Sequence, residues 1–336
     1  MSESASPRAR FVVGTGRCGS TLLSRMLSEN PGVLSLYEWF SGIDQFFRFR
    51  PDPVSGAELA GRLIQDHPML TMVLARGYEV PEVVYPFGAP GMRHALGDPI
   101  PWSLSIAIPR IHDDPDALFD EMIRRVEQHP TQPLASHYRS IFDWLVERVG
   151  RRWWIERGGS SIDTVAELHT MFPDARFVHI HRDGPETALS MREYPVLRVA
   201  VVVMYGLLGD IEYSHEGLTQ MERDDPAAID RLLETRPPVE LYGRYWSEQI
   251  ERGQPVLEKL PADGVLDLRF EDMVADPVRV LRGLHEFFEF GADDRWIERG
   301  AALVRGMPRL RFPGLPPDEQ ERLAKACAPA MALLGR

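Results

Sequence analysis

A glycine-rich stretch near the amino terminus has the residue types of a phosphate-binding loop. It reads VGTGRCGSTLL over residues 13–23 and follows a short apolar run. Its glycines permit positive φ and a close approach of the backbone, so several N–H groups can converge on one phosphate at a helix N-terminus. Ser20 and Thr21 would add hydroxyl donors. The stretch predicts an anion-binding turn, and a plain glycine-rich turn between strand and helix is the alternative.

The loop lacks the lysine of a nucleoside-triphosphate site. In the pattern G-x-x-x-x-G-K-S/T, the lysine reaches the β- and γ-phosphates. When this pattern is aligned on Gly14 and Gly19, the lysine position is Ser20, and the cation of the loop is Arg17 instead. A P-loop nucleotide kinase or phosphotransferase is therefore a weaker alternative, which a strict dependence on magnesium would support.

The loop resembles the 5′-phosphosulfate loop of the sulfotransferases that use 3′-phosphoadenosine-5′-phosphosulfate (PAPS). That loop has the form K/R-S/T-G-S/T-S/T-x-L after a short strand, and residues 17–23 match it apart from Cys18. The resemblance implies that no Walker lysine is needed, because this donor has no β/γ-phosphate pair and needs no magnesium. It also implies that Arg17 lies beside the oxygen that bridges phosphate and sulfate, where negative charge grows as the bond breaks.

Three further segments resemble elements of the same family. The family's 3′-phosphate site has an arginine after a strand and a serine eight residues on, as Arg182 and Ser190 are here, although Gly184 separates the acidic residue from the proline. The segment WIER, ending at Arg157, resembles a W-x-E-K element whose lysine neutralises the transferring sulfuryl group; two glycines replace the small residue and proline that follow it. Residues 268–277 resemble a structural R-Y/F-E-D-L-x-x-D-P element.

Each of these matches has an ordinary explanation when taken alone. Arg182 could form a surface ion pair and Ser190 could be an exposed helix residue, because most charged and polar residues are simply solvated. The matches occur in the family's order across residues 11–290, and together they favour the sulfotransferase resemblance. The family's basic C-terminal loop, often R-K-G, is not clearly present, and its candidate stand-ins are Arg305, Gly306, Arg309 and Arg311.

The resemblance points to Glu38 as the general base for the acceptor hydroxyl. Tyrosylprotein sulfotransferases use a glutamate twenty-one residues past the loop arginine, which is the spacing of Glu38 from Arg17. Aromatic neighbours should bury Glu38, and burial raises the pKa of a carboxylate toward a useful base strength. A glutamate paired with an arginine at the pocket edge is the alternative. Other family members use histidine, and the competing histidines are His67, His94, His112 and His137.

Two other patterns of reactive residues have ordinary explanations. His179 and His181 would place two imidazoles on one face of a strand, but no cysteine or carboxylate pattern completes a metal site. No metal is therefore expected. Cys18 lies in a loop at a helix N-terminus, where a thiol pKa is lowered. It occupies the position of a small residue in the family's loop, so we interpret it as a packing substitute rather than a nucleophile.

The elements that carry these residues alternate between strand and helix. The candidate strands are residues 11–13, 176–180 and 265–270, and the candidate helices are 20–29, 161–172, 186–193 and a segment that begins at 276. Such alternation indicates a parallel sheet flanked by helices. The predicted class is therefore α/β, and the resemblance implies the P-loop-like sulfotransferase fold with a helical insertion.

We expect residues 1–10 to form a disordered tail and residues 11–336 to form a single sulfotransferase-like domain. Residues 40–150 are interpreted as an insertion that shapes the acceptor site. Its helices are expected near 115–128 and 134–149, its proline-rich loop over 81–101, and its pocket-shaping aromatic residues are Trp102, Tyr138 and Trp144.

The composition limits the compartment and the partners. The 336 residues have a formal net charge of −12, with 44% hydrophobic and 26% charged residues, which is typical of a soluble globular protein. This acidic balance argues against a general nucleic-acid or anionic-membrane binder, because such proteins gather positive charge. Two cysteines are too few for a disulfide framework. With no signal-peptide core and no apolar run long enough to span a membrane, we expect a cytoplasmic protein.

The resemblance implies an enzyme that transfers the sulfuryl group of PAPS to the hydroxyl of a small molecule or peptide by in-line attack. Adenosine 3′,5′-bisphosphate would be the product. The expected catalytic residues are Arg17, Glu38 and Arg157, and the expected donor-binding residues are Gly16, Arg17, Cys18, Gly19, Ser20, Thr21, Arg182 and Ser190. A non-catalytic nucleotide-binding protein on the same scaffold is a further alternative, and it would bind the bisphosphate without transferring anything.

Overall fold

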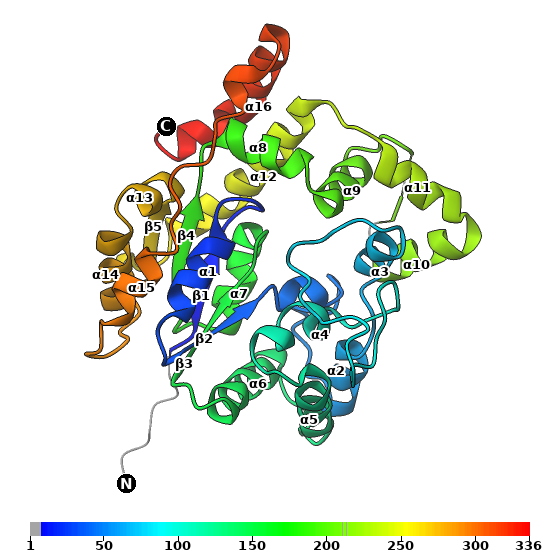
Figure 1. Cartoon of the computed structure of the whole chain (residues 1–336), viewed down its shortest axis with the longest axis vertical. Helices are drawn as coiled ribbons and strands as arrows, with labels where there is room; N and C mark the ends of the chain where they lie inside the picture. The colour runs from blue at the N-terminus through cyan, green and yellow to red at the C-terminus, as the bar shows by residue number, and fades with distance from the viewer. Residues whose placement is uncertain (1–7, 210, 213) are drawn as a thin grey trace. The chain divides into compact units, whose positions relative to one another are not determined.

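The structure is a computed structural model that describes residues 8–209, 211–212 and 214–336 (Figure 1). Most of the predicted tail, residues 1–7, lies outside these described residues. The chain forms two compact units, and the single domain over residues 11–336 stays a prediction. Unit 1 comprises the described chain up to Tyr37, Tyr138–Arg182 and Arg252–Arg309, and unit 2 comprises Glu38–His137, Asp183–Glu251 and Leu310–Arg336.

Unit 1 is built on a five-stranded sheet with the order β2-β3-β1-β4-β5 (Figure 1). Every neighbouring pair is parallel, so the predicted α/β class with a central parallel sheet is confirmed. The strands are β1 (Arg10–Val13), β2 (Val33–Tyr37), β3 (Trp153–Arg157), β4 (Arg176–His181) and β5 (Val265–Arg269). All four residues of β1 are buried, as expected for a central parallel strand that is covered on both faces.

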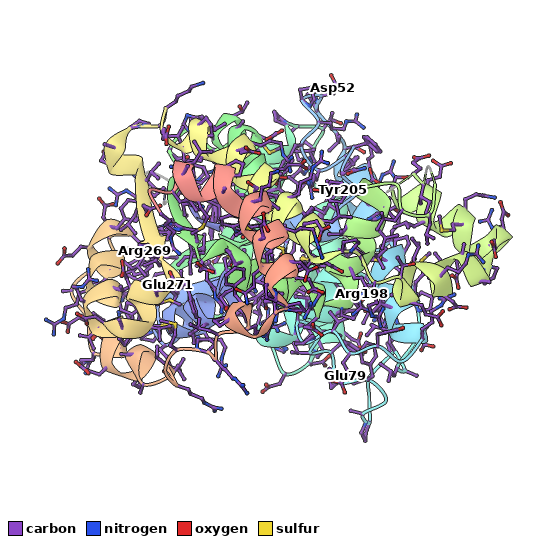
Figure 2. All side chains as sticks on the ribbon, turned by 90° about the horizontal axis from the view of Figure 1, so that it is seen from above. Asp52, Glu79, Arg198, Tyr205, Arg269 and Glu271 are labelled. Carbon is purple, nitrogen blue, oxygen red and sulfur yellow. The ribbon has the colours of Figure 1, made fainter. Side chains whose placement is uncertain are left out.

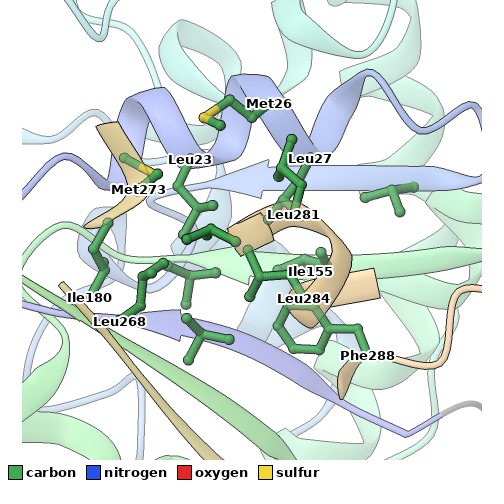
Figure 3. Close-up of a cluster of buried hydrophobic side chains, with 14 of the residues drawn as sticks. Leu23, Met26, Leu27, Ile155, Ile180, Leu268, Met273, Leu281, Leu284 and Phe288 are labelled. Atoms are coloured by element: carbon green, nitrogen blue, oxygen red, sulfur yellow. The ribbon is translucent and has the colours of Figure 1, made fainter. Parts of the chain in front are cut away.

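The two faces of the sheet have different cores. Successive side chains of a strand point to opposite faces, and in β1 Phe11 enters an aromatic cluster while Val12 enters a mainly aliphatic one. The ring of Phe11 lies 5.3 Å from that of Phe172 and 5.8 Å from that of Trp154, measured between centroids. On the mainly aliphatic face, α1 (Ser20–Ser28) and α14 (Pro277–Phe287) contribute Leu23, Leu27, Leu281 and Leu284, which Figure 3 shows packed with strand residues such as Ile155, Ile180 and Leu268. Helix α15 (Trp296–Ala301) adds Trp296 and Ile297 to the same cluster.

The sequence of α14 explains why this helix forms and which of its residues enter the core. Asp276 caps the helix by accepting a 3.1 Å hydrogen bond from the backbone N of Arg279, and Pro277 stands in the first turn. Val280, Leu281 and Leu284 then recur at helical spacing and are buried. The helix predicted from residue 276 is therefore confirmed. The other short elements of unit 1 are η3 (Ile162–Thr164), α7 (Val165–Met171), η4 (Ala262–Gly264) and α13 (Phe270–Ala275).

Unit 2 is helical. Its helices are α2 (Gly56–Leu63), α3 (Pro68–Ala75), α4 (Trp102–Ile106), α5 (Pro115–Glu127), α8 (Gly184–Arg192), α9 (Pro195–Met204), α10 (His215–Asp224), α11 (Pro226–Glu234) and α16 (Pro317–Leu333), with three short 3-10 helices, η1 (Phe40–Gly42), η2 (Ile108–Arg110) and η5 (Phe312–Gly314). Helices α6 (Leu134–Arg148) and α12 (Val239–Leu257) contribute residues to both units. The predicted proline-rich loop over residues 81–101 contains no helix or strand.

A second aliphatic core joins α3, α9, α10 and α11. Arg198 of α9 is buried beside it and donates a 3.0 Å hydrogen bond to the carbonyl oxygen of Leu233 (Figure 2). This bond satisfies one of the carbonyls that a helix C-terminus leaves without a partner. Among the helices of the described residues, none is long and apolar enough to cross a membrane.

Candidate active site

Three predicted site arginines belong to adjacent strands of unit 1. Arg157 ends β3, Arg17 follows β1 and Arg182 follows β4, and β1 lies between β3 and β4 in the sheet. The strands are parallel, so their carboxyl ends lie at one edge. The order of the sheet reverses about β1, and such a switch point is where open parallel sheets bind ligands. The structure thus brings these three cations to the edge of the sheet where a ligand site is expected.

The loop after β1 has a backbone that requires glycine. A Cβ at Gly14 would lie 2.5 Å from the carbonyl oxygen of Ile180, and a Cβ at Gly19 would collide with the ring of Phe270. Gly19 has φ +98° and Arg17 has φ +66°, which is the left-handed region. An L-residue other than glycine in this region costs roughly 1–2 kcal/mol. Arg17 therefore holds a strained conformation, of the kind found at ligand-binding loops.

Helix α1 begins directly after this loop. Ser20 is its first residue and is buried, and Thr21 is half-buried. The first N–H groups of a helix have no partner within the helix, and they bear partial positive charge. The loop and the start of α1 are therefore suited to an anion, as the sequence predicted.

Cys18 points into the protein. Its side chain is fully buried in the aliphatic core with Leu23 and Ile180. Burial raises the pKa of the Cys18 thiol, although a hydrogen bond with Ser20 and the charge of Arg157 act in the opposite direction. A thiol with a raised pKa is a poor nucleophile. These features support its interpretation as a packing residue.

Arg157 is buried at the end of β3, beside the end of β2 and the loop after β1. It is 1% exposed, and its guanidinium carbon lies 4.6 Å from the ring centroid of Tyr37, a geometry for cation–π attraction. The turn after β3 is joined to the loop, because the backbone N of Ser161 donates a 2.9 Å hydrogen bond to the carbonyl oxygen of Gly14. A Cβ at Gly158 would lie 2.7 Å from the Cβ of Ser161. This tight turn explains one of the glycines that replace the family's small residue and proline.

Phe270 connects the loop to Arg182. The guanidinium carbon of Arg182 lies 4.9 Å from the centroid of the Phe270 ring, and the same ring occupies the space beside Gly19. Phe270 opens α13 directly after β5, within the R-F-E-D segment that sequence reasoning treated as structural. Figure 2 shows Arg269 and Glu271, on either side of Phe270, at the β5 end of unit 1. One clue to this contact was present in the sequence, because Phe270 occupies the aromatic position of the R-F-E-D segment.

The two histidines of β4 share one carboxylate on β5. His181 Nε2 lies 2.9 Å from Asp267 Oδ2, and His179 Nδ1 lies 3.5 Å from Asp267 Oδ1. Burial lowers the pKa of His179. Burial acts to raise the pKa of Asp267, but the hydrogen bonds of both histidines outweigh it and hold that pKa well below its usual range. Among the described residues, no group of three histidine, cysteine or acidic side chains is arranged to hold a metal ion.

Glu38 lies in unit 2, directly after the last residue of β2. It is 9% exposed and has φ +53°. Its Oε2 accepts a 2.9 Å hydrogen bond from the Ser41 hydroxyl, and its carbonyl oxygen accepts a 2.8 Å bond from Trp102 Nε1. A Cβ at Gly42 would collide with the Trp102 indole, so the glycine permits this contact. The predicted base is therefore buried, and side chains on both sides fix its orientation.

One of the competing histidines packs beside the same tryptophan. The His67 ring lies 4.7 Å from the Trp102 ring and 4.6 Å from the ring of His215, measured between centroids. Burial is the main cause that lowers the pKa of His67 to about 3. A histidine with so low a pKa is a weak base. His215 was not predicted, because it lies far from the insertion in the sequence.

The other predicted residues of the insertion have different surroundings. His137 is buried and makes a 2.9 Å hydrogen bond to the carbonyl oxygen of Val54, and the ring of His112 accepts a 3.0 Å bond from the backbone N of Asp114, two residues on. His94 packs against the ring of Tyr85. Tyr138 belongs to unit 1, where it is fully buried and stacks on Phe142, so it is a core residue rather than a pocket wall. Trp144, on the same helix, is half-buried.

Ser190 is buried on α8 of unit 2. The helix begins at Gly184, where a Cβ would lie 2.5 Å from the Trp246 ring, so packing explains the extra glycine before Pro185. Asp183 caps the helix by accepting a 3.0 Å hydrogen bond from the backbone N of Glu186. The departure from the family's pattern therefore leaves a well-formed helix start.

Glu186 is a buried carboxylate that sequence reasoning missed. It accepts hydrogen bonds of 2.8 Å and 2.9 Å from the backbone N atoms of Arg311 and Phe312. Arg311 Nη1 in turn donates a 3.3 Å bond to the carbonyl oxygen of Leu189, the neighbour of Ser190. Of the candidate C-terminal stand-ins, Arg311 is therefore fixed beside α8, while Arg305 and Arg309 belong to unit 1.

Comparisons with known proteins agree with this architecture. A family model described as the sulfotransferase family matches residues 105–204, which include Arg157, Arg182 and Ser190. Among solved structures, the sulfotransferase domain from the curacin biosynthetic pathway has a TM-score of 0.50 at 14% identity, over 99% of this chain and 99% of that chain.

Two further solved structures are similar at lower TM-scores. The sulfotransferase domain of the Synechococcus PCC 7002 olefin synthase has a TM-score of 0.44 at 17% identity, over 100% of this chain and 96% of that chain. Sulfotransferase STF9 from Mycobacterium avium has a TM-score of 0.45 at 17% identity, over 98% of this chain and 77% of that chain. Among curated proteins, no sequence matches this chain. The fold is that of the sulfotransferases, and the resemblance seen in the sequence is confirmed.

Proposed function

We propose that this protein is an enzyme that transfers the sulfuryl group of PAPS to the hydroxyl of a small molecule or a peptide. The observation that carries this proposal is the meeting of Arg17, Arg157 and Arg182 at the carboxyl edge of three adjacent parallel strands. An edge with three cations and a glycine loop suits a ligand with several anionic groups. The sulfotransferase fold supports a sulfuryl donor as that ligand.

The donor-binding roles follow from the environment of each residue. The backbone N–H groups of residues 16–21, with the hydroxyls of Ser20 and Thr21, would hold the 5′-phosphate, since the loop leads directly into the N-terminus of α1. Arg182 and Ser190 would hold the 3′-phosphate. No lysine and no metal ion are required, because the donor has no triphosphate to neutralise.

The chemical step needs one base and two cations. The donor supplies a sulfuryl group attached to a nucleotide leaving group. Glu38 takes the proton of the acceptor hydroxyl as its oxygen attacks sulfur in line with the bond that breaks. Arg17 stabilises the negative charge that the bridging oxygen gains, and Arg157 stabilises the charge on the sulfuryl oxygens. The products are a sulfate ester and adenosine 3′,5′-bisphosphate.

We place this reaction in the cytoplasm. Cys18 and Cys327 are both buried and form no disulfide, and disulfides are rare in reducing compartments. Trp102, which contacts Glu38, is the aromatic residue of the insertion best placed to meet the acceptor.

Nucleotide binding followed by a product screen tests the proposal. Without magnesium, adenosine 3′,5′-bisphosphate should stabilise the protein by about 2.7 kcal/mol at a hundredfold excess over its dissociation constant, and ATP should stabilise it much less. A mass-spectrometric screen with PAPS should then detect a sulfated acceptor. An equal shift from ATP that requires magnesium would favour a phosphotransferase, and binding without any transfer would favour a non-catalytic protein.

A further inference from the structure

A cavity of about 450 Å³ lies in unit 2, among residues that have no role in the proposed transfer. This volume is within the range of small-molecule sites. One side of the cavity, which we call its floor, consists of Pro101, just before α4, Leu104 of α4, and Phe119 and Ile123 of α5. All four side chains are buried. An apolar floor of this kind favours a ligand that carries an apolar body, because binding removes that surface from water.

The rim of the cavity is charged. It carries the carboxylates of Asp66, Asp120 and Glu127 and the guanidinium groups of Arg93 and Arg124. Arg93 Nη2 pairs with Asp120 Oδ2 at 2.7 Å. Arg124 and Glu127 are one turn apart on α5, a spacing at which opposite charges offset each other. Three carboxylates against two guanidinium groups give the lining a net negative charge, and Asp66 is the carboxylate whose backbone pairs with Pro101 of the apolar floor.

Asp66 is fixed at the edge of the apolar floor. Its backbone pairs with Pro101 in an isolated antiparallel bridge, and its Oδ2 accepts a 2.7 Å hydrogen bond from the Thr71 hydroxyl. Burial lowers the pKa of His215 below its usual value, although the charges of Asp44 and Asp66 act to raise it. His215 is therefore largely neutral at pH 7 and does not neutralise Asp66 there.

We propose that this cavity binds an amphipathic monocation. Its apolar body lies on the floor of Pro101, Leu104, Phe119 and Ile123, and its ammonium or guanidinium group donates hydrogen bonds to Asp66. Bonds between charged partners are stronger and more directional than neutral ones. This site goes beyond sulfuryl transfer, because none of its residues contacts the donor or the acceptor proton in the proposed reaction.

The cavity and the proposed base share a wall. Pro101 and Leu104 face the cavity, whereas Trp102, on the same short helix, donates its indole hydrogen bond to the carbonyl oxygen of Glu38. Asp66 is followed by His67, which packs on Trp102. A ligand in the cavity thus touches residues next to Trp102, which bonds to the Glu38 backbone, and next to His67, which packs on Trp102.

Titration calorimetry with three probes of equal chain length tests the proposal. The full chain is titrated with octylammonium, octanoate and octanol in the absence of PAPS. Octylammonium should bind saturably at one site, and more tightly than either other probe. Asp66→Asn should weaken octylammonium binding by about tenfold, which corresponds to one charged hydrogen bond. It should leave octanol binding unchanged, and Asp113→Asn, an exposed carboxylate outside the lining, should change neither.

A second pair of variants tests the location. Ile123→Trp fills the floor and should abolish binding, whereas Ala117→Trp adds the same ring to an exposed position of α5 and should not. If Ile123→Trp does not fold, the Asp66→Asn comparison decides the question. Equal affinity for the three probes, a preference for octanoate, or binding that neither Asp66→Asn nor Ile123→Trp changes would overturn the proposal. The measurement involves no transfer step, so failure of the proposed function would leave it intact.

Discussion

The arginines of unit 1 and the carboxylates of unit 2 are positioned by different means. Arg17, Arg157 and Arg182 are placed by backbone topology, because each stands at the carboxyl end of a buried parallel strand. Glu38 and Glu186 are placed by hydrogen bonds with residues distant in sequence. Replacing one of these arginines should leave the sheet edge in place, whereas removing a hydrogen bond of Glu38 or Glu186 changes a contact that positions the backbone. Substitutions in the two units should therefore have effects of different kinds.

The largest effect is expected in unit 2. Glu38→Gln should reduce turnover by roughly 10²–10⁴-fold, because the amide cannot accept the acceptor's proton. Binding of adenosine 3′,5′-bisphosphate should not change. The acidic limb of the pH–rate profile should disappear, since it reports deprotonation of the base.

Ser41→Ala is the matched control for Glu38. It removes the hydrogen bond to Oε2 and keeps the carboxylate, so turnover should fall much less. If Glu38→Gln retains both near-normal turnover and the acidic limb, Glu38 is not the base, and the other histidines of the insertion, His94, His112 and His137, become the next residues to test.

Arg17→Ala tests the sheet edge of unit 1. The arginine faces charge that appears only as the bridging bond breaks, so kcat should fall by about 10²–10³-fold with a modest change in nucleotide affinity. Arg25→Ala, on the exposed face of α1, should leave both quantities near wild type. A large loss of affinity with an unchanged kcat would contradict this role.

Arg182→Ala tests the same sheet edge, but the quantity measured is the affinity for the donor rather than kcat. One charged hydrogen bond to the 3′-phosphate contributes about 1.5–3 kcal/mol, so donor affinity should fall by roughly tenfold or more. The variant should also lose its preference for PAPS over adenosine 5′-phosphosulfate. Calorimetry with both nucleotides measures this preference, and an unchanged preference in a folded variant would remove Arg182 from the site.

Glu186→Gln tests a side-chain contact of unit 2. The backbone N–H groups of Arg311 and Phe312 both donate to Oε1, and the N of Arg311 also lies 3.1 Å from Oε2, where Gln would place an NH2 donor against an N–H donor. This loss of an acceptor should cost about 1–3 kcal/mol of unfolding free energy. Limited proteolysis should then cleave near residues 311–314 more quickly. Glu193→Gln, an exposed change at the end of the same helix, provides the control. Equal cleavage rates for the two variants would show that Glu186 does not fix this segment.

The smallest effect is expected at Asp267. Its pKa in the folded protein lies below the usual value, so the carboxylate stabilises the fold at neutral pH, and this contribution is lost as pH falls below about 4. Asp267→Asn should therefore lower the melting temperature slightly at pH 7, and the difference from wild type should shrink in acid. Because Asp267 is largely exposed, the difference is expected to be small. A difference that grows in acid would contradict the assignment.

The sequence predicted those strands and helices of unit 1 that a short stretch of residues is enough to recognise. β1, β4 and β5 are short apolar runs between turns, and α1 and α14 have helical spacing with clear ends. β2 and β3 were not recognised as strands. In β3, the buried residues include Glu156 and Arg157, each 1% exposed, so charged side chains interrupt the apolar run. Charges are seldom buried without partners, which is why a site strand is hard to recognise from composition.

Contacts between distant segments could not be predicted. Glu186 and Arg311 are separated by 125 residues, and Trp102 and Glu38 by 64. Neither pair has a periodic pattern, because each depends on how whole helices pack. Motif spacing did identify Arg17, Arg157, Arg182, Ser190 and Glu38, whose roles stay predictions. α9 was seen only as an apolar run, because most of its residues are buried and it shows no polar face.

During synthesis of the chain, β1 is made long before the strands that pair with it. β1 bonds only to β3 and β4 among the described strands, and its register with β3 joins Phe11 to Glu156. A ribosome adds about 5–20 residues per second, so roughly 7–30 s separate the synthesis of the glycine loop from that of its first neighbouring strand. During this interval the apolar β1 segment has no sheet to join. The native pairing of β1 can therefore begin only after residue 157 has been made, and a nascent chain stalled before that point would leave β1 open to chaperones.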